Sequence, residues 1–84
     1  MAEREVVWSH VAGADLDRLD RPVRRRIIEA VARFAATDSG NVRRLADVDP
    51  PEYRLRVGQW RVRFLINGQR LMILRVLPRD KAYK

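Results

Sequence analysis

The chain has no cysteine and only one histidine among its 84 residues. The lack of cysteine excludes a disulfide-stapled scaffold, a thiolate metal site and cysteine-based catalysis. One histidine cannot build an imidazole zinc site, so we expect neither a metal nor a small-molecule cofactor. This residue, His10, falls where a strand should pass into a helix, and it is most simply a solvated or capping residue.

Long hydrophobic runs are also absent. No apolar stretch approaches the roughly 20 residues that span a bilayer, and the N-terminus has no signal-peptide core. With 46% hydrophobic residues, the whole chain, 1–84, fits a single domain around one core. We therefore expect a cytoplasmic protein with no membrane partner.

Negative charge is scarce in one half of the chain. Eighteen Lys and Arg against 11 Asp and Glu give a net charge of +7. Residues 1–42 balance to zero, with seven arginines and seven acidic residues, whereas residues 43–84 hold nine arginines and two lysines against four acidic residues. This asymmetry indicates a polyanionic partner, most simply nucleic acid. The alternative is an ordinary solvated surface in an arginine-rich chain.

The first half of the sequence predicts one strand and two helices. Residues 5–8 are rich in β-branched and aromatic residues and indicate a strand. Ser9 is suited to cap a short helix whose buried stripe contains Ala12, Leu16 and Leu19. Asp20 and Pro22 favour the start of a second helix that ends near Ala36. Its apolar face consists of Val23, Ile27, Val31, Phe34 and Ala35.

The second half predicts three strands. Residues 53–57 and 60–66 alternate with a period of two, and residues 70–77 form a more apolar strand that we expect inside the sheet. Gly58–Gln59 fits a type II′ turn, and Asn67–Gly68 is a strong hairpin signal. The two helices should form an antiparallel hairpin. Gly40 or Asn41 suits a left-handed turn after the second helix. Residues 41–52 should then form a loop that Leu45 and Val48 anchor.

These elements define an α+β fold in the order β-α-α-β-β-β. We expect the helical hairpin to cover one face of a small antiparallel sheet, with the first strand added at an edge. The residues that should face the helices are Tyr53, Leu55, Val57, Trp60, Val62, Phe64, Ile66, Met72, Leu74 and Val76.

Strand alternation then places five arginines on the uncovered face: Arg54, Arg56, Arg61, Arg63 and Arg75. Like charges opposite each other destabilise a sheet, so folding alone does not explain the cluster. Guanidinium groups make forked contacts with phosphate and stack on bases. The alternative is that they pair with acidic neighbours, but the four carboxylates, Asp47, Asp49, Glu52 and Asp80, cannot neutralise eleven cations.

Two segments resemble the RelE/ParE superfamily, the small bacterial toxins of type II toxin–antitoxin pairs. They are Tyr53–Phe64, which reads YRLRVGQWRVRF, and Val76–Tyr83, which reads VLPRDKAY. The helical pattern of residues 15–34 fits the same superfamily, so the likeness spans essentially the whole chain and implies a RelE-like fold. It also implies a ribosome-dependent endonuclease that cleaves mRNA in the ribosomal A site, inhibits translation and is neutralised by a cognate antitoxin.

The resemblance assigns roles to individual residues. The positions that match the superfamily's catalytic residues are Arg54, Arg56, Arg61, Arg79 and Tyr83. Arg61 and Arg79 suit a clamp on the cut phosphate, and Tyr83 suits stacking on a base. Further substrate contacts are expected from Arg63, Arg75 and Lys81.

Two departures from the superfamily concern catalysis. The basic pair is typically lysine, whereas here it is Arg54 and Arg56, and arginine essentially cannot release a proton. The sequence therefore shows no clear general base, and Lys81 and Asp80 are candidates by position only. Many relatives also carry a histidine where this chain has Pro78.

Two other functions stay open. A ParE-like toxin would inhibit DNA gyrase by binding, without nuclease activity, and the lack of an acid–base pair favours it. An inactive member would serve only as a partner-binding module. The intact Arg61, Arg79 and Tyr83 favour mRNA cleavage. In each toxin reading an antitoxin should lie across the basic face or the helical hairpin.

Overall fold

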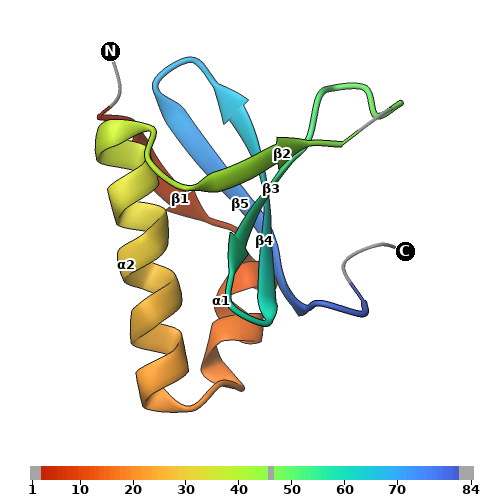
Figure 1. Cartoon of the computed structure of the whole chain (residues 1–84). Helices are drawn as coiled ribbons and strands as arrows, with labels where there is room; N and C mark the ends of the chain where they lie inside the picture. Colours follow the sequence, from red (N-terminus) through yellow and green to blue (C-terminus); the bar gives the residue numbers. More distant parts are fainter. Residues whose placement is uncertain (1–2, 46, 82–84) are drawn as a thin grey trace.

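The structure, a computed structural model, describes residues 3–45 and 47–81 and shows an α+β fold (Figure 1). Its elements are β1 (Glu5–Trp8), α1 (His10–Asp17), α2 (Arg21–Thr37), β2 (Asn41–Arg44), β3 (Tyr53–Val57), β4 (Trp60–Asn67) and β5 (Arg70–Pro78). The expected fold class is confirmed, since two helices pack against one sheet. Within the described part of the chain, neither helix is long and apolar enough to cross a membrane.

The sheet has five strands in the order β1-β5-β4-β3-β2. Strands β2 to β5 pair antiparallel, and β1 lies at the edge as expected, but it runs parallel to β5 and makes the sheet mixed. The other edge strand, β2, lies within residues 41–52, where the sequence predicted only a loop. Val42 is the one apolar residue of β2, so a period of two could not be recognised there.

The helix boundaries follow the expected capping residues closely. The Ser9 hydroxyl oxygen accepts a hydrogen bond from the Ala12 N–H at 3.0 Å, which confirms this N-cap. Asp20 occupies the N-cap of α2, although its side chain makes no capping hydrogen bond. Helix α2 ends at Thr37, and Asp38 takes the left-handed turn with φ of 61°, so the prediction of Gly40 or Asn41 for that turn was wrong.

Both hairpins turn on a Gly-Gln pair. Gly58–Gln59 connects β3 and β4 as expected, with a φ of 58° at Gly58. Asn67 is still paired with Arg70, so the second turn is Gly68–Gln69 and not Asn67–Gly68. Gly68 has a φ of 60°, which shows that the glycine fixes the turn one residue later than the Asn-Gly signal suggested.

One core lies between the helices and the sheet. Helix α2 contributes Ile27, Val31, Phe34 and Ala35, and α1 contributes Ala12 and Leu16. The rings of Phe34 and Phe64 lie 5.4 Å apart, joining α2 to the middle of the sheet. The buried sheet residues are Leu55, Val57, Val62, Phe64, Leu71, Ile73 and Val76.

A β-bulge changes which residues of β5 reach this core. The register between β4 and β5 shifts after Arg63, which faces Arg75, because Phe64 faces Ile73. The bulge inserts an extra residue in β5, so Ile73 and Val76 both point to the helices. Met72 and Leu74 were predicted to face the helices, and this was wrong, because Leu71 and Ile73 are the core residues there. The prediction for Val76 was right.

Candidate nucleic-acid interface

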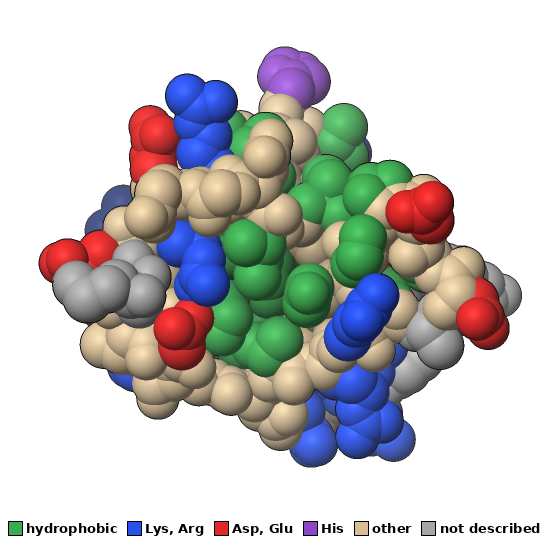
Figure 2. All heavy atoms as spheres, turned by 90° about the horizontal axis from the view of Figure 1, so that it is seen from above, with side chains coloured by type: hydrophobic (Ala, Val, Ile, Leu, Met, Phe, Trp, Pro, Cys, Tyr) green, Lys and Arg blue, Asp and Glu red, His purple; other side chains and the backbone are tan. Residues whose placement is uncertain are grey.

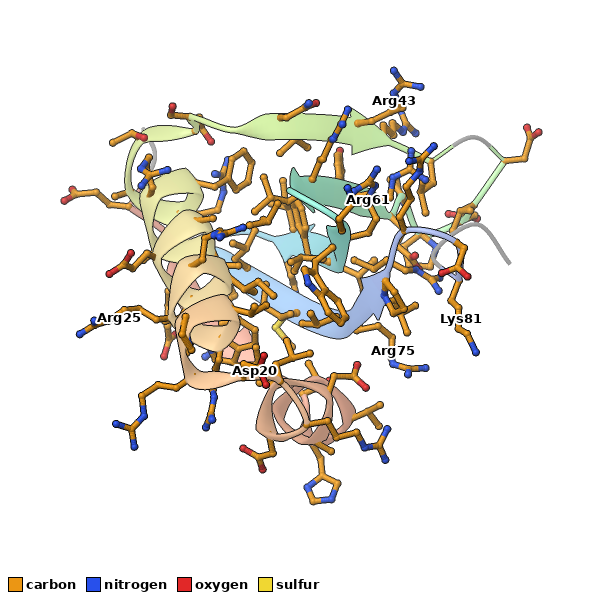
Figure 3. The ribbon with its side chains drawn as sticks, turned by 60° about the horizontal axis from the view of Figure 1, so that its bottom comes forward. Asp20, Arg25, Arg43, Arg61, Arg75 and Lys81 are labelled. Atoms are coloured by element: carbon orange, nitrogen blue, oxygen red, sulfur yellow. The ribbon has the colours of Figure 1, made fainter. Side chains whose placement is uncertain are left out.

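Two rows of opposed residues cross the sheet on the face that the helices leave uncovered. The first row is Arg43, Arg54, Arg63 and Arg75, one from each of β2, β3, β4 and β5. The second row is Asn41, Arg56, Arg61 and Leu77. We call these eight residues the arginine face. Figure 3 shows Arg43 and Arg61 on the side of the molecule away from α2. The convergence predicted from strand alternation is therefore present.

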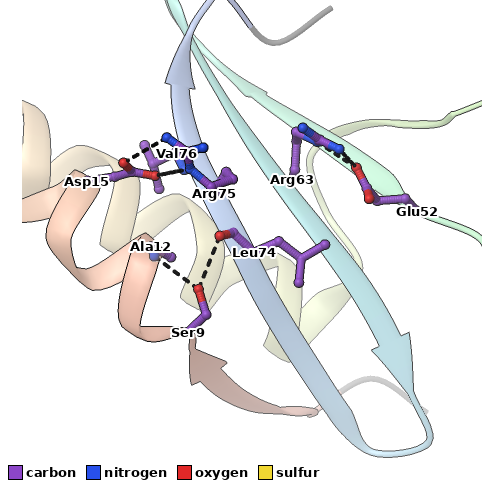
Figure 4. A network of polar contacts seen from close by, with 8 residues as sticks. All are labelled: Ser9, Ala12, Asp15, Glu52, Arg63, Leu74, Arg75 and Val76. Carbon is purple, nitrogen blue, oxygen red and sulfur yellow. Dashed lines mark hydrogen bonds and ion pairs between the residues drawn. The ribbon is translucent and has the colours of Figure 1, made fainter. Parts of the chain in front are cut away.

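Two of these arginines are paired with buried carboxylates (Figure 4). Arg75 binds Asp15 through two hydrogen bonds, Nε to Oδ2 at 2.9 Å and Nη2 to Oδ1 at 3.2 Å. Arg63 pairs with Glu52. Glu52 was among the acidic residues that the alternative interpretation named as partners, whereas Asp15 lies 60 residues from Arg75 in the electrically neutral half of the sequence.

The surroundings of Asp15 keep its carboxylate ionised. Burial acts to raise the pKa of Asp15, which is 6% exposed. Hydrogen bonds from Arg75 and from the Val76 N–H, with the charges of Arg75 and Arg18, outweigh burial and hold this pKa below its ordinary value. The hydrogen bond to Asp15 raises the pKa of Arg75 in turn. The pair is therefore fully charged at neutral pH.

A pocket of about 110 Å³ lies on the arginine face at the side of β2. Among residues 3–45 and 47–81 it is lined by Asn41, Arg43, Arg54, Arg56 and Arg61. We call it the β2 pocket. Arg61 is only 5% exposed and donates from Nη1 to the carbonyl oxygens of Gly58 and Trp60, both at 3.0 Å. Its guanidinium is thus held in place before any ligand arrives.

A second, more open hollow of about 470 Å³ lies on the same face toward the C-terminus. Arg63, Arg75, Leu77, Asp80 and Lys81 line it. Arg79 is exposed, and its backbone N–H donates to the Gln59 carbonyl at 2.8 Å, which brings this segment beside the β3–β4 turn. Tyr83, the remaining residue predicted for the site, lies outside the described residues.

The sequence analysis missed Asn41 and Arg43, because both lie on the unrecognised strand β2. Only the register with β3 shows that both side chains lie on the arginine face, because Asn41 is opposite Arg56 and Arg43 is opposite Arg54. His10 begins α1 and is exposed, as expected, and it protrudes from the surface in Figure 2. Among residues 3–45 and 47–81, no group of three His, Cys, Asp or Glu could hold a metal ion.

This arrangement suits the binding of phosphate and the stabilisation of charge on it. Four guanidinium groups around one pocket offer many donors and no proton acceptor. Such a site can neutralise the charge that grows on a phosphorus centre during transfer. It does not by itself supply a general base, because arginine stays protonated.

The match to a family model, together with the fold, shows that this chain is a small type II toxin of the RelE/ParE superfamily. Residues 6–83 match the family described as the ParE toxin of the type II toxin–antitoxin system parDE, and the chain belongs to this family. A comparison with curated proteins found no match.

Three solved structures of similar fold come from toxin–antitoxin complexes. The chain is 22% identical to a chain of the archaeal RelE–RelB complex from Pyrococcus horikoshii OT3, with a TM-score of 0.78 over 94% of this chain and 98% of that one. It is 21% identical to a chain of the RelB–RelE complex from Methanococcus jannaschii, with a TM-score of 0.75 over 92% and 94%. It is 21% identical to a chain of the RelBE2 complex from Mycobacterium tuberculosis, with a TM-score of 0.71 over 93% of this chain and 100% of that one.

Proposed function

We propose that this toxin cleaves mRNA in the ribosomal A site and thereby inhibits translation in the cytoplasm. The observation that carries the proposal is the β2 pocket, where four arginines line one hollow on the open face of the sheet. Arginines opposed across neighbouring strands destabilise a sheet. An RNA phosphate would compensate that cost.

The chemistry would depend on positioning and on charge neutralisation. Attack by a ribose 2′-hydroxyl on the adjacent phosphate places extra negative charge on the phosphate oxygens. Arg61 is pre-organised by two backbone carbonyls, and Arg79 lies beside the same turn, so these two would clamp the reacting phosphate. Arg54 and Arg56 would add charge from the neighbouring strand, and Tyr83 would stack on a base.

The other predicted substrate contacts differ in whether they already bind a carboxylate. Arg63 and Arg75 already hold carboxylates, so we expect them to shape the face more than to bind RNA. Lys81 and Asp80 are exposed and share the second hollow, where they stay candidates for moving the proton of the 2′-hydroxyl.

A cognate antitoxin is the proposed protein partner. The similar folds from Pyrococcus and Methanococcus were solved with RelB antitoxins. Figure 2 shows hydrophobic side chains gathered on one face of this chain, with basic side chains close by. A segment that combines apolar and acidic side chains would match such a surface and mask the arginines, and salt should weaken its binding.

Inhibition of DNA gyrase without nuclease activity is the second candidate function. It is favoured by the match to the ParE family over residues 6–83 and by arginine at both positions of the basic pair. A third reading, an inactive partner-binding module, predicts that expression of the chain is harmless.

The test compares the purified toxin on translating ribosomes that carry a defined mRNA with a gyrase supercoiling assay. We expect cuts in phase with the codons and a loss of about 100-fold or more in cleavage rate for Arg61→Ala. Arg33→Ala removes the same charge from an exposed position of α2 and should cleave normally. Circular dichroism would confirm that both variants fold. Intact mRNA together with blocked supercoiling would establish the gyrase function instead.

A further inference from the structure

We propose that Asn41 and Arg43 of the edge strand add a second phosphate subsite on the outer side of the β2 pocket, which binds an RNA phosphate next to the one that Arg61 holds for cleavage. Arg43 would be a positioning residue that holds this neighbouring phosphate. Asn41 would contact the adjoining ribose. The inference rests on the proposed function, because it assumes that RNA crosses the arginine face.

The register of β2 places both residues at the pocket. Arg43 lies directly opposite Arg54, and Asn41 lies directly opposite Arg56. Side chains opposed in this way start about 5 Å apart on the same face of the sheet. Arg43 and Arg56 are exposed, so a ligand can reach them from solvent, whereas Arg54 and Arg61 are mostly buried and form the floor.

The lining selects the chemical class of the ligand. Four of the five lining side chains carry only donors and a positive charge. A volume of about 110 Å³ restricts the pocket to small groups such as phosphate. Among the described residues that line the pocket, Asn41 alone carries a side-chain acceptor, its amide oxygen, and a ribose 2′-hydroxyl is a donor that DNA lacks.

The position of Arg43 separates it from the reacting phosphate. Arg79 lies at the β3–β4 turn beside Gln59, and Arg61 faces Leu77 of β5 on one side and Arg56 of β3 on the other. Strand β2 is two strands from β4, about 10 Å away. Arg43 would therefore bind a different phosphate from the one at Arg79. Contacts remote from the reacting atoms orient the substrate for reaction.

The same strand offers a matched control for Arg43. Arg44 is its immediate neighbour and is also exposed, but it lies opposite Tyr53 and so belongs to the other face of the sheet. Arg44→Ala removes the same charge as Arg43→Ala, from the same strand, without touching the pocket.

The experiment measures binding of the free toxin to the trinucleotide ApApA and to its deoxy counterpart at several salt concentrations. Each phosphate contact on a single strand contributes about 0.7 to the slope of log K against log salt. We expect Arg43→Ala to reduce that slope by about 0.7, and Arg44→Ala to leave it near the wild-type value. Asn41→Ala should keep the slope but lower the preference for RNA over DNA severalfold.

Cleavage on ribosomes is measured in parallel, so that the two proposals can fail separately. If the wild type cleaves mRNA but Arg43→Ala and Arg44→Ala match each other in slope and in cleavage, the subsite is overturned and the nuclease function stands. If the wild type neither binds ApApA nor cleaves mRNA, both are overturned. Equal melting temperatures of the two variants would show that differences arise from binding.

Discussion

At the residue scale, Asp15 shows how one side chain fixes the edge of the sheet. Strand β1 pairs with β5 only from Arg70 to Ile73, so the rest of that edge of β5 has no strand partner there. Helix α1 and its N-cap bind backbone groups along this part of β5. The Ser9 hydroxyl donates to the Leu74 carbonyl at 3.1 Å, and the Asp15 carboxylate accepts from the Val76 N–H at 2.9 Å. Exposed polar groups at a sheet edge invite pairing with other chains, and α1 prevents this.

Replacing Asp15 should therefore destabilise the fold. Asp15→Ala leaves the Val76 N–H and Arg75 without their partner, and we expect the free energy of unfolding to fall by about 3 kcal/mol. Asp15→Asn keeps an acceptor for Val76 and should cost less. Urea denaturation at pH 7 measures both, with exposed Asp17→Ala as the control. Equal stability of Asp15→Ala and Asp17→Ala would contradict this role.

The contribution of the Asp15 charge should also depend on pH. Its pKa is lowered in the folded protein, so the unfolded chain takes up a proton first as the pH falls. The advantage of the wild type over Asp15→Asn is then complete above the ordinary value of about 3.9 and shrinks as the pH falls through the folded-state pKa. Denaturation at pH 7 and pH 3 checks this, and an advantage that grows toward pH 3 would refute it.

At the element scale, the connection from α2 to β2 depends on a close approach of the backbone. Gly40 has a φ of 154°, which side-chain-bearing residues rarely adopt. A Cβ atom at Gly40 would lie 2.9 Å from Leu55 Cδ1, inside the core. The backbone therefore needs glycine at position 40 to place strand β2, and with it Arg43, at the edge of the sheet.

We expect Gly40→Ala to lower the free energy of unfolding by about 3 kcal/mol, from strain and from displacement of Leu55. Gly68→Ala is the matched control, because it also has a positive φ, of 60°, but an added Cβ would have no atom within 4 Å. This variant should lose only about 1 kcal/mol. Urea denaturation separates the two, and equal losses would show that the Leu55 contact is unimportant.

Periodicity predicted the regular elements and failed where the pattern is short or uniform. The first hairpin could be predicted because Gly58 sits between two alternating strands. The bulge in β5 could not, because residues 71–74 are all apolar and show no alternation to fix a register. Strand β2 was missed because its four residues contain one inward apolar side chain, Val42.

At the scale of the whole molecule, the net charge of +7 is concentrated in the half of the chain that builds most of the sheet. Self-repulsion opposes the compact state, and here it is strongest among the opposed arginines of the arginine face. The partly buried ion pairs Arg63–Glu52 and Arg75–Asp15 reduce this repulsion locally. The remaining charge gives the free toxin a positive surface for a polyanion.

Salt should therefore stabilise the free protein. Raising NaCl from 0.05 to 0.3 M screens repulsion between exposed arginines more than attraction within the partly buried pairs. We expect the melting temperature to rise by a few degrees, and to rise less in Arg43→Ala, which removes one opposed charge. A melting temperature that falls with salt would mean that the ion pairs outweigh the repulsion.

The sequence by itself determined the class of the fold, the two helices, three of the four strands in the sheet's antiparallel part and the face on which the arginines gather. It could do so because helical and strand periods are local properties of the chain. The tertiary structure alone decided which arginines hold carboxylates and which line the β2 pocket. The pairing of Arg75 with Asp15 joins residues 60 positions apart, and the place of Arg43 depends on strand register, so neither leaves a local pattern.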